Sequence, residues 1–521
     1  MSKKITTKTN KSSLFIFILC GVFIAAGYVT ITLWFQHQLN PDATSYFTIA
    51  KKYADGDLRH AINGYWGPLY SWLLVPFVWL GANLIVAAKM INVAAAAIIL
   101  ISVYFFLKSQ NVRPTIANVI CLISAPILFS WATIDTITPD MLFALWTWLF
   151  SITLLLFLRT PTARRAMLLG LTGALMYFTK SIGLPLFVCV LLIAAAYQWY
   201  RIRPSINSIL KLYSPVFITL ACLVLPFIAL ISLKYGHPTI STAAAYNFSI
   251  VGPDLQWHQA LGSGVYNPPN STAISPWEDP TAMTAYLPAW SPFESRDHFK
   301  YYFISIIGKN LVTFVESLYI FGPIVVGGML VYILGMFGSS SRKQFGVFTA
   351  ISATLIMAYT SLALEGRYIW VVAVFAAVSI GIFTQRLYER KVITHQQVVL
   401  AGVLIFALSS VHLGVNLNNS KNIDKPTYQA AVALKKYIPI GSHIATDDFN
   451  SAIFACWNDG YICHGTLSPP TGDQTAYLQS LRTAGISYYV VYGANDTQKQ
   501  FTDAYAVRIP TNIKVVIYKI K

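Results

Sequence analysis

Long apolar runs alternate with short polar connections over the first four-fifths of the chain. The runs are about 20 residues long, which is the length that lets a helix cross the apolar core of a bilayer. The pattern predicts eleven membrane-spanning helices, at residues 14–35, 83–107, 114–132, 141–158, 167–179, 182–199, 214–233, 317–337, 345–363, 370–385 and 396–413. The first run follows the basic start MSKKITTKTNK. It is too long for the apolar part of a signal peptide and has no small-residue cleavage pattern behind it, so we expect a retained helix.

The composition supports this interpretation, because 55% of the residues are hydrophobic and the mean hydropathy is +0.56. Ordinary soluble domains are roughly 45–50% apolar. A single soluble core of this length and polarity would leave too little polar surface. The sequence therefore predicts an α-helical polytopic membrane protein, located in the inner (plasma) membrane.

The net charge of +17 is explained by topology rather than by nucleic-acid binding. Positive residues gather in the loops on one side of the predicted bundle, as they do in cytoplasmic loops of membrane proteins. We expect the N-terminus and these loops on the cytoplasmic side and the C-terminus outside. The loops contain one acid, Glu389. Their basic residues are Lys3, Lys4, Lys8, Lys11, Lys108, Arg113, Arg159, Arg164, Arg165, Arg201, Arg203, Lys211, Arg342, Lys343, Arg386, Arg390 and Lys391.

This topology gives a transmembrane module over residues 1–413, with outer loops at 36–82 and 234–316, and an outer domain over 414–521. The outer domain has the pattern of a small α/β fold. YQAAVALKKY and TAYLQSLRTAG predict helices, and SHIATDDF, ISYYVVYG and IKVVIYKI predict strands. The aromatic segment 65–82 is short and contains two prolines, so we expect it to lie along the outer membrane face.

The six cysteines divide between these two parts of the chain. Cys20, Cys121, Cys189 and Cys222 fall in apolar spans and are expected to be small core residues. Cys456 and Cys463 fall in the outer domain, where oxidising conditions allow disulfides. These two are a disulfide candidate, although spacing alone does not establish the geometry.

The first outer loop contains several charges directly after an apolar span. In NPDATSYFTIAKKYADGD, Lys51 and Lys52 follow Asp42, and Arg59 comes shortly after. Long outer loops tolerate such charges freely. Alternatively, these cations attract an anionic headgroup held at the interface. The sequence leaves both explanations open.

Ionisable residues also mark the outer ends of other spans. Asp135 and Asp140 flank DTITPD, Lys180 ends GALMYFTK, and Glu365 and Arg367 belong to EGRY. Each could simply mark a helix end, as an acid in a first turn does. Together, on one face, they supply carboxylates for base chemistry and cations for a phosphate.

These motifs resemble those of the C-type (GT-C) glycosyltransferases, which include the bacterial lipid A aminoarabinose transferase and the protein O-mannosyltransferases. The likeness covers roughly residues 14–400 and rests on DATSY leading to GYWGPLYSWL, then TPDMLF, YFTKSIGLP and EGRY, in this order. The resemblance implies a polyprenyl-phosphate-linked sugar as donor and a cell-envelope hydroxyl as acceptor, with transfer on the outer face.

The resemblance also assigns roles to residues. It implies Asp42 as catalytic base, Asp140 as a second catalytic acidic residue, and Lys180 with Arg367 as contacts for the donor phosphate. We include Tyr46, Arg59, Glu365 and Tyr368 among the candidate donor-binding residues. One departure is WGPL at 66–69 where many relatives have KPPL, so a lysine near the phosphate is absent. Lys51, Arg59 and His60 are candidate substitutes.

The chemistry agrees with this assignment, since a sugar on a lipid phosphate is already activated. The enzyme needs a base for the acceptor's proton and cations for the leaving phosphate. Asp42 and Tyr46 are one turn apart, so both face one cleft if their segment is helical. A single displacement, without a covalent intermediate, would invert the sugar's configuration.

No metal site is predicted, but a divalent cation is a candidate cofactor. Outside the C-terminal domain the outer histidines are scattered, at His37, His60, His237, His258 and His298. Paired histidines at ligand spacing are absent. Glu278 and Asp279 in PWEDP have the oxygen ligands that divalent cations prefer, but the pattern favours a solvated loop turn.

Two other function classes fit the sequence less well. A lipid or sugar transporter, or a flippase, should carry charges near the middle of its spans and break its helices there. Here the spans are nearly free of charge, with Lys89 as the main exception, and no internal repeat stands out. A non-catalytic scaffold that displays the outer domain would need only one anchor helix.

Overall fold

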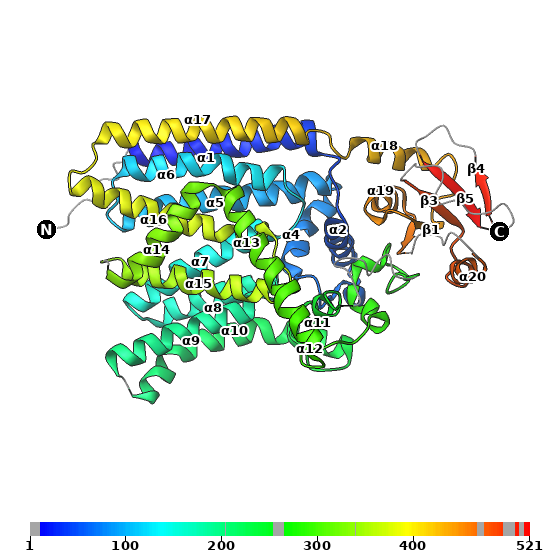
Figure 1. Ribbon diagram of the computed structural model, residues 1–521, viewed down its shortest axis with the longest axis horizontal. Helices are drawn as coiled ribbons and strands as arrows, with labels where there is room; N and C mark the ends of the chain where they lie inside the picture. Colours follow the sequence, from blue (N-terminus) through cyan, green and yellow to red (C-terminus); the bar gives the residue numbers. More distant parts are fainter. Residues whose placement is uncertain are drawn as a thin grey trace.

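The protein is an elongated helical bundle that carries a small domain at one end (Figure 1). The computed structural model describes residues 11–203, 205–253, 265–338, 340–465, 474–492, 506–509 and 515–520. The described chain begins, at residue 11, at one end of the bundle, and the C-terminal domain lies at the other.

The bundle consists of long, mostly apolar helices that run along its length. They are α1 (Lys11–Thr30, continued by a π-helical turn at Ile31–Phe35), α5 (Leu84–Ser109), α6 (Pro114–Thr133), α7 (Asp140–Arg159), α8 (Ala163–Thr179), α9 (Gly183–Ile202), α10 (Ile206–Tyr235), α14 (Pro323–Gly338), α15 (Arg342–Thr360), α16 (Trp370–Glu389) and α17 (His395–Ser420). Among the described residues, 9 helical stretches are long and apolar enough to cross a membrane. The chain is a multi-pass membrane protein.

Local signals start these helices where the apolar runs begin. The Asn83 side chain accepts hydrogen bonds from the backbone N–H groups of Ile85 and Val86 at the start of α5. Thr394 and Gln397 form a reciprocal capping box at the start of α17. Pro114 begins α6, where its missing N–H costs nothing. Such caps satisfy donors that the first helical turn leaves unpaired.

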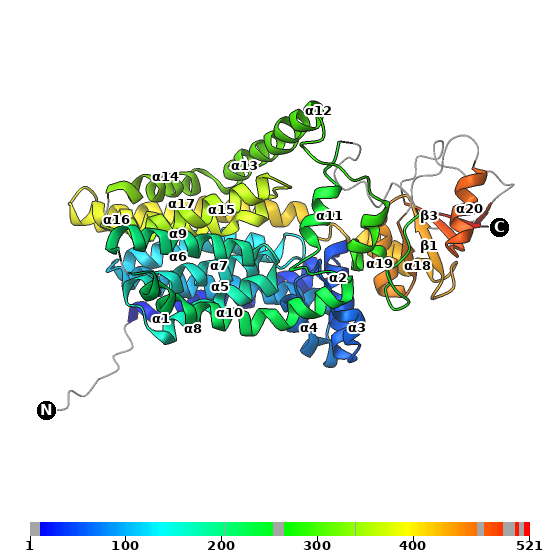
Figure 2. The same cartoon turned by 90° about the horizontal axis from the view of Figure 1, so that it is seen from below.

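The expected span 317–337 is wrong as a single helix. The chain breaks at Gly322, whose φ of 86° is left-handed, and α14 begins at Pro323. Residues before the break form α12 (Arg296–Lys300), a π-helix (Tyr301–Ile307) and α13 (Gly308–Phe321), so the end of the expected outer loop 234–316 is helical. α12 and α13 slant away from the bundle (Figure 2). The apolar run continues through the break, so hydropathy alone did not reveal it.

Side-chain contacts at each end confirm how the loops group. At the basic end, Gln344 donates to Gln110 over 2.7 Å, and the backbone N–H of Arg113 donates to Gln385. At the opposite end, Gln38 donates to the carbonyl of Ile134. The loops predicted to share a side therefore meet at the same end of the bundle.

The loop after α1 folds into three short helices at the end opposite the basic loops. They are α2 (Pro41–Ala54), α3 (Leu58–Ala61) and α4 (Pro68–Trp79). The aromatic segment 65–82 forms α4, whose Ser71 hydroxyl donates to the backbone oxygen of Tyr46 in α2. Trp79 and Leu80 are 70% and 78% exposed, as a segment at a membrane interface would be.

The chain beyond α10 crosses the same end before it returns to the bundle. Here the 3-10 helix Pro276–Glu278 packs on α2, and a second 3-10 helix, Pro280–Tyr286, packs on α11 (Ala243–Ser249). A further 3-10 helix, Gly366–Ile369, precedes α16.

The C-terminal domain is an α/β fold with a mixed five-stranded sheet in the order β2-β1-β3-β5-β4. β1 is parallel to β2 and β3, whereas β5 is antiparallel to β3 and β4. The elements are α18 (Lys425–Leu434), β1 (His443–Thr446), α19 (Phe449–Asp459), β2 (Ile462–His464), α20 (Thr475–Thr483), β3 (Tyr488–Val491), β4 (Ala506–Ile509) and β5 (Val516–Ile520). The expected helices and strands are present, while α19, β2 and β4 were not foreseen.

The cysteines follow the prediction in part. Cys456 and Cys463 form a disulfide between α19 and β2. Cys20 and Cys121 are buried, but Cys189 and Cys222 are exposed on the outside of the bundle, so their expected core placement is wrong. A membrane protein is apolar on its lipid-facing surface as well, and hydropathy therefore does not separate core from surface within a span.

The C-terminal domain is expected to lose stability in acid, because burial and the nearby His443 lower the pKa of His464 from 6.5 to about 4. Between these values the folded state keeps His464 neutral while the unfolded chain binds a proton. The stability that the neutral His464 contributes to the folded state is thus present above pH 6.5 and is lost as the pH falls towards 4. The thermal unfolding midpoint of the domain, followed by circular dichroism, should fall between pH 7 and pH 5. His464→Gln should lose clearly less over that interval; an equal loss would contradict this cause.

Candidate active site

A cavity of about 250 Å³ opens at the end of the bundle that carries the C-terminal domain. Its walls come from α2, α7, the junction of α8 and α9, α15 and the turn before α16. It contains every candidate catalytic and donor-binding residue except Arg59, and its ionisable and aromatic lining is Asp42, Tyr46, Tyr65, Trp66, Asp140, Lys180, Trp277, Tyr359, Glu365, Arg367 and Tyr368.

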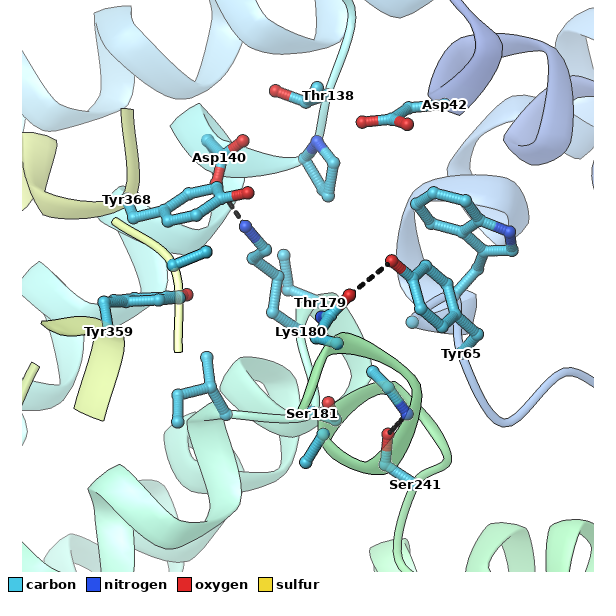
Figure 3. A pocket seen from close by; sticks show the side chains of 18 of the residues that line it. Asp42, Tyr65, Thr138, Asp140, Thr179, Lys180, Ser181, Ser241, Tyr359 and Tyr368 are labelled. Atoms are coloured by element: carbon cyan, nitrogen blue, oxygen red, sulfur yellow. Dashed lines mark hydrogen bonds and ion pairs between the residues drawn. The ribbon is translucent and has the colours of Figure 1, made fainter. Parts of the chain in front are cut away.

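A buried carboxylate at the start of α7 holds two cations. Asp140 is 1% exposed and stands in the first helical turn after Pro139. The Nζ atom of Lys180, at the end of α8, lies 2.6 Å from Asp140 Oδ1. Figure 3 shows this lysine reaching across the cavity to Asp140, with the ring of Tyr368 beside it. Removing Asp140 would leave both cations without their buried partner.

Arg367 is the second cation, and its guanidinium joins four neighbours. It donates to the Thr136 hydroxyl over 2.7 Å and pairs with Glu365 at 2.9 Å. It lies 3.5 Å from Asp140 and 3.9 Å from Asp42. The contact with Asp140 is made by its buried Nε, which has no hydrogen-bond partner among the described residues. A planar guanidinium, with its several N–H donors, is well suited to bind the oxygens of a phosphate.

Asp42 differs from Asp140 in its access to the cavity. It lies in the first turn of α2. The extended Asn40 precedes this helix, and Pro41 is its first residue. Its side chain is 24% exposed, against 1% for Asp140. The indole Nε1–H of Trp277 donates to Asp42 Oδ1 over 2.9 Å. Of these two carboxylates, Asp42 is therefore the one that an incoming molecule can reach, and Trp277 fixes its orientation. Glu365, whose side chain is 38% exposed, is a further accessible carboxylate of the cavity.

Aromatic rings complete the cavity on both sides. Tyr359 and Tyr368 stack with ring centroids 4.5 Å apart, and Lys180 Nζ lies 4.0 Å from the centre of the Tyr368 ring. Across the cavity, Trp66 packs against Tyr46 and Trp277 at 5.2 and 6.0 Å. One wall is thus aromatic and cationic, and the other is aromatic with Asp42.

Tyr368 also donates to Glu365 over 3.1 Å. Burial raises the pKa of Glu365, although Arg367 opposes the shift. Asp135 is not among the residues that line the cavity. Burial raises its pKa, and its backbone oxygen accepts a hydrogen bond from Lys89 over 2.9 Å. Lys89, the exceptional charge in the spans, therefore secures the loop before α7.

The segment PWEDP is anchored in protein, and the expectation of a solvated turn is wrong. Glu278 and Asp279 are 2% and 6% exposed. Glu278 pairs with Lys52 of α2, and Asp279 pairs with Lys234 of α10 at 3.0 Å. Burial raises the pKa of Glu278, against the attraction of Lys52. These pairs hold the segment in the position from which Trp277 reaches Asp42.

Breaking the buried Lys52–Glu278 pair should destabilise the protein. Lys52→Met leaves Glu278 buried without its partner, which typically costs about 3–5 kcal/mol. We expect a lower thermal unfolding midpoint in detergent for Lys52→Met. The double variant Lys52→Met/Glu278→Leu should recover most of the loss, since an apolar replacement of both partners is often neutral. A single variant as stable as the wild type would rule out this anchoring role.

The remaining predicted cations lie elsewhere. Arg59 is exposed on α3 and does not line the cavity. Lys51 lies 3.9 Å from the centre of the Trp457 ring in the C-terminal domain. His60 pairs with Asp57 at 2.8 Å, and this contact lowers the pKa of Asp57. None of these side chains stands where a phosphate in the cavity would lie.

The part of the chain that the structure describes contains no cluster of side chains that could bind a metal ion. There, no three or more His, Cys, Asp or Glu side chains come together as a metal site would require. His258 lies outside the described residues.

Sequence reasoning missed several aromatic residues of the site, namely Tyr65, Trp66, Trp277 and Tyr359. Trp277 matters most, because it contacts Asp42. It is separated from Asp42 by 235 positions and belongs to a motif with the composition of a turn. A tryptophan directly after a proline and before two acids was the one available signal, because the N–H of a buried tryptophan usually finds a hydrogen-bond partner.

Comparison with known proteins supports the fold. No protein-family model and no curated protein sequence matches the chain. The crystal structure of ArnT from Cupriavidus metallidurans bound to undecaprenyl phosphate aligns with a TM-score of 0.56 at 12% identity, over 96% of this chain and 97% of that one. The apo state of the same protein aligns with a TM-score of 0.55 at 12% identity, over 95% and 97%. The chain has the GT-C fold of these structures.

Proposed function

We propose that this protein is an integral-membrane glycosyltransferase that moves a sugar from a polyprenyl-phosphate carrier to a hydroxyl of a cell-envelope acceptor. One observation carries the proposal: an accessible carboxylate, Asp42, shares a cavity with two cations, Lys180 and Arg367, at one end of a membrane bundle. The GT-C fold supports it, as does the undecaprenyl phosphate bound to ArnT in one of the aligned structures.

In the proposed reaction, Asp42 accepts the proton of the acceptor hydroxyl as its oxygen attacks the anomeric carbon of the sugar. The bond between that carbon and the phosphate oxygen breaks, and the polyprenyl phosphate leaves with the electron pair. Lys180 and Arg367 stabilise the negative charge that develops on the leaving phosphate. Because one displacement connects substrate and product, the configuration of the sugar inverts.

Asp140 acts through the cations in this scheme. Its burial between Lys180 and Arg367 keeps both positive side chains in place before the donor arrives. Preorganised charges of this kind need no rearrangement when the transition state forms. Asp140 is therefore a positioning residue in this proposal, rather than a second base.

Loss of the protein from cells tests the proposal. Mass spectrometry of envelope glycans should show one sugar missing in a deletion strain, and its polyprenyl-phosphate form should accumulate among the extracted lipids. Wild-type protein supplied from a plasmid should restore both. Unchanged glycans and lipid-linked sugars in the deletion strain would contradict the proposal.

The proposed orientation places the basic end in the cytoplasm and the cavity with the C-terminal domain outside, as the distribution of basic loops favours. In a background without Cys20, Cys121, Cys189 and Cys222, single cysteines at 110, 161 and 205 should resist a membrane-impermeant thiol reagent added from outside. A single cysteine at position 436, which is exposed in the C-terminal domain, should react. Reaction at the first three positions in intact cells would show that the orientation is the opposite of the one proposed.

A further inference from the structure

The C-terminal domain touches both elements that hold Asp42. Its helix α19 packs on α2, the helix that carries Asp42. The ring of Trp457 lies 5.2 Å from that of Phe47, and Lys51 Nζ lies 3.9 Å from the centre of the Trp457 ring. Phe47 is fully buried, and both α2 contacts fall within about two and a half turns of Asp42.

The second contact reaches the segment that carries Trp277. The backbone N–H of Cys463, in β2, donates to the carbonyl of Ile274 over 2.8 Å. The backbone N–H of Tyr266 donates to the carbonyl of Gly465 over 2.9 Å. The loop 266–274 thus hydrogen-bonds to β2 and to the residue that follows it. Three residues after Ile274, Trp277 donates to Asp42.

A covalent bond joins these two contacts. The disulfide between Cys456 and Cys463 ties α19, which packs on α2, to β2, which pairs with the loop. The result is a closed ring of contacts: α2, α19, the disulfide, β2, the loop 266–277 and, through Trp277, Asp42 again. Asp42 is therefore held from both sides by elements that the C-terminal domain connects.

The phosphate side of the cavity is held differently. Among the described residues, the ion pairs of Lys180 and Arg367 go to bundle-end residues, namely Asp42, Asp140 and Glu365. Arg367 also bonds Thr136, which precedes α7. The C-terminal domain thus adds to the support that the Lys52–Glu278 and Lys234–Asp279 pairs give to Trp277 and Asp42, whereas these contacts of the cations come from the bundle.

We propose that the C-terminal domain positions Asp42 for catalysis, with Trp457 and the Cys456–Cys463 disulfide as its positioning residues. The inference rests on the proposed function, in which Asp42 is the base. A base must lie within hydrogen-bond reach of the proton that it removes, and a displacement of about 1 Å can cost roughly 10²-fold in rate. Loosening the ring should therefore lower kcat and leave donor binding to Lys180 and Arg367 intact.

The test compares Trp457→Ala and the double variant Cys456→Ala/Cys463→Ala with the full-length wild type in nanodiscs. We expect kcat to fall about 10- to 100-fold in both. The Kd for undecaprenyl phosphate, used as the binding probe, should stay within about threefold of the wild-type value, well below the tenfold that 1.4 kcal/mol represents. Trp457→Phe keeps a ring against Phe47 and should retain most of the activity.

Leu478→Ala is the matched control. It removes buried apolar contacts from the same domain, in α20, and leaves α19, β2 and their contacts with α2 and the loop in place. If the domain merely needed to be folded, Leu478→Ala and Trp457→Ala would lower kcat alike. An equal loss in both, or an unchanged kcat in Trp457→Ala, would overturn the proposal.

Hydrogen–deuterium exchange separates this proposal from the proposed function. Trp457→Ala should speed exchange in peptides from 41–54 and 265–279 but not in peptides from 140–180. This readout does not need turnover. If the wild type transferred no sugar, the proposed function would fail, but exchange would still show whether the C-terminal domain stabilises α2. Unchanged exchange in peptides from 41–54 would show that it does not.

Discussion

We expect Asp42→Asn to insert and fold like the wild type but to turn over at least roughly 10²–10⁴-fold more slowly, the loss typical of removing a general base. The structure explains why folding should survive. The asparagine amide oxygen can still accept the hydrogen bond from Trp277 Nε1, which lies 2.9 Å from Asp42 Oδ1. What disappears is the basic carboxylate in the accessible position.

Asp57→Asn is the matched control, because it makes the same substitution in the same outer loop. Asp57 caps the short helix α3 and pairs with His60, outside the cavity. We expect turnover close to the wild-type value. Both variants should show wild-type thermal unfolding in detergent, so that a loss of rate in Asp42→Asn reflects chemistry.

Arg367→Ala should have the second largest effect, through donor binding. A hydrogen bond to a charged group contributes on the order of 1.5–3 kcal/mol, which is about a 10- to 100-fold change in Kd. Titration of the purified variant with undecaprenyl phosphate measures this change directly. Arg367→Lys keeps the charge among Asp42, Asp140 and Glu365 but loses the paired N–H donors of the planar guanidinium. It should therefore bind undecaprenyl phosphate with an intermediate Kd.

Arg59→Ala controls for bulk charge, since Arg59 belongs to the candidate donor-binding residues by sequence but is exposed on α3. We expect Arg59→Ala to bind undecaprenyl phosphate with the wild-type Kd. If Arg367→Ala bound undecaprenyl phosphate as tightly as the wild type, or if Arg59→Ala weakened binding equally, the phosphate role of Arg367 would have to be abandoned.

The bundle could be predicted well because its signal is local. Apolar runs of sufficient length give the spans, and the basic loops show which ends belong together. The helix break at Gly322 escaped prediction since the residues on both sides are apolar. For the same reason, the sequence could not show that Cys189 and Cys222 face outward.

The candidate site was predictable where motif order supplied its residues. Asp42, Asp140, Lys180 and Arg367 meet in one cavity although they come from separate parts of the chain. Arg59 is close to Asp42 in sequence, but the turn at Asp55–Asp57 carries it out of the cavity on α3.

The anchoring of PWEDP could not be inferred from local pattern. Glu278 finds its partner Lys52 across 226 positions of sequence, and two prolines and two acids in a row look like a surface turn. Only the folded chain shows that burial and pairing turn this segment into a support for Trp277.

The most direct test of the central claim is a single-turnover measurement on purified protein in nanodiscs. A polyprenyl-phosphate-linked sugar and an envelope extract are supplied, and release of polyprenyl phosphate and labelling of the acceptor are followed by mass spectrometry. Wild-type protein should transfer the sugar, and Asp42→Asn should do so at least roughly 10²-fold more slowly with an unchanged Kd for undecaprenyl phosphate. Near-normal transfer by Asp42→Asn would contradict the catalytic assignment.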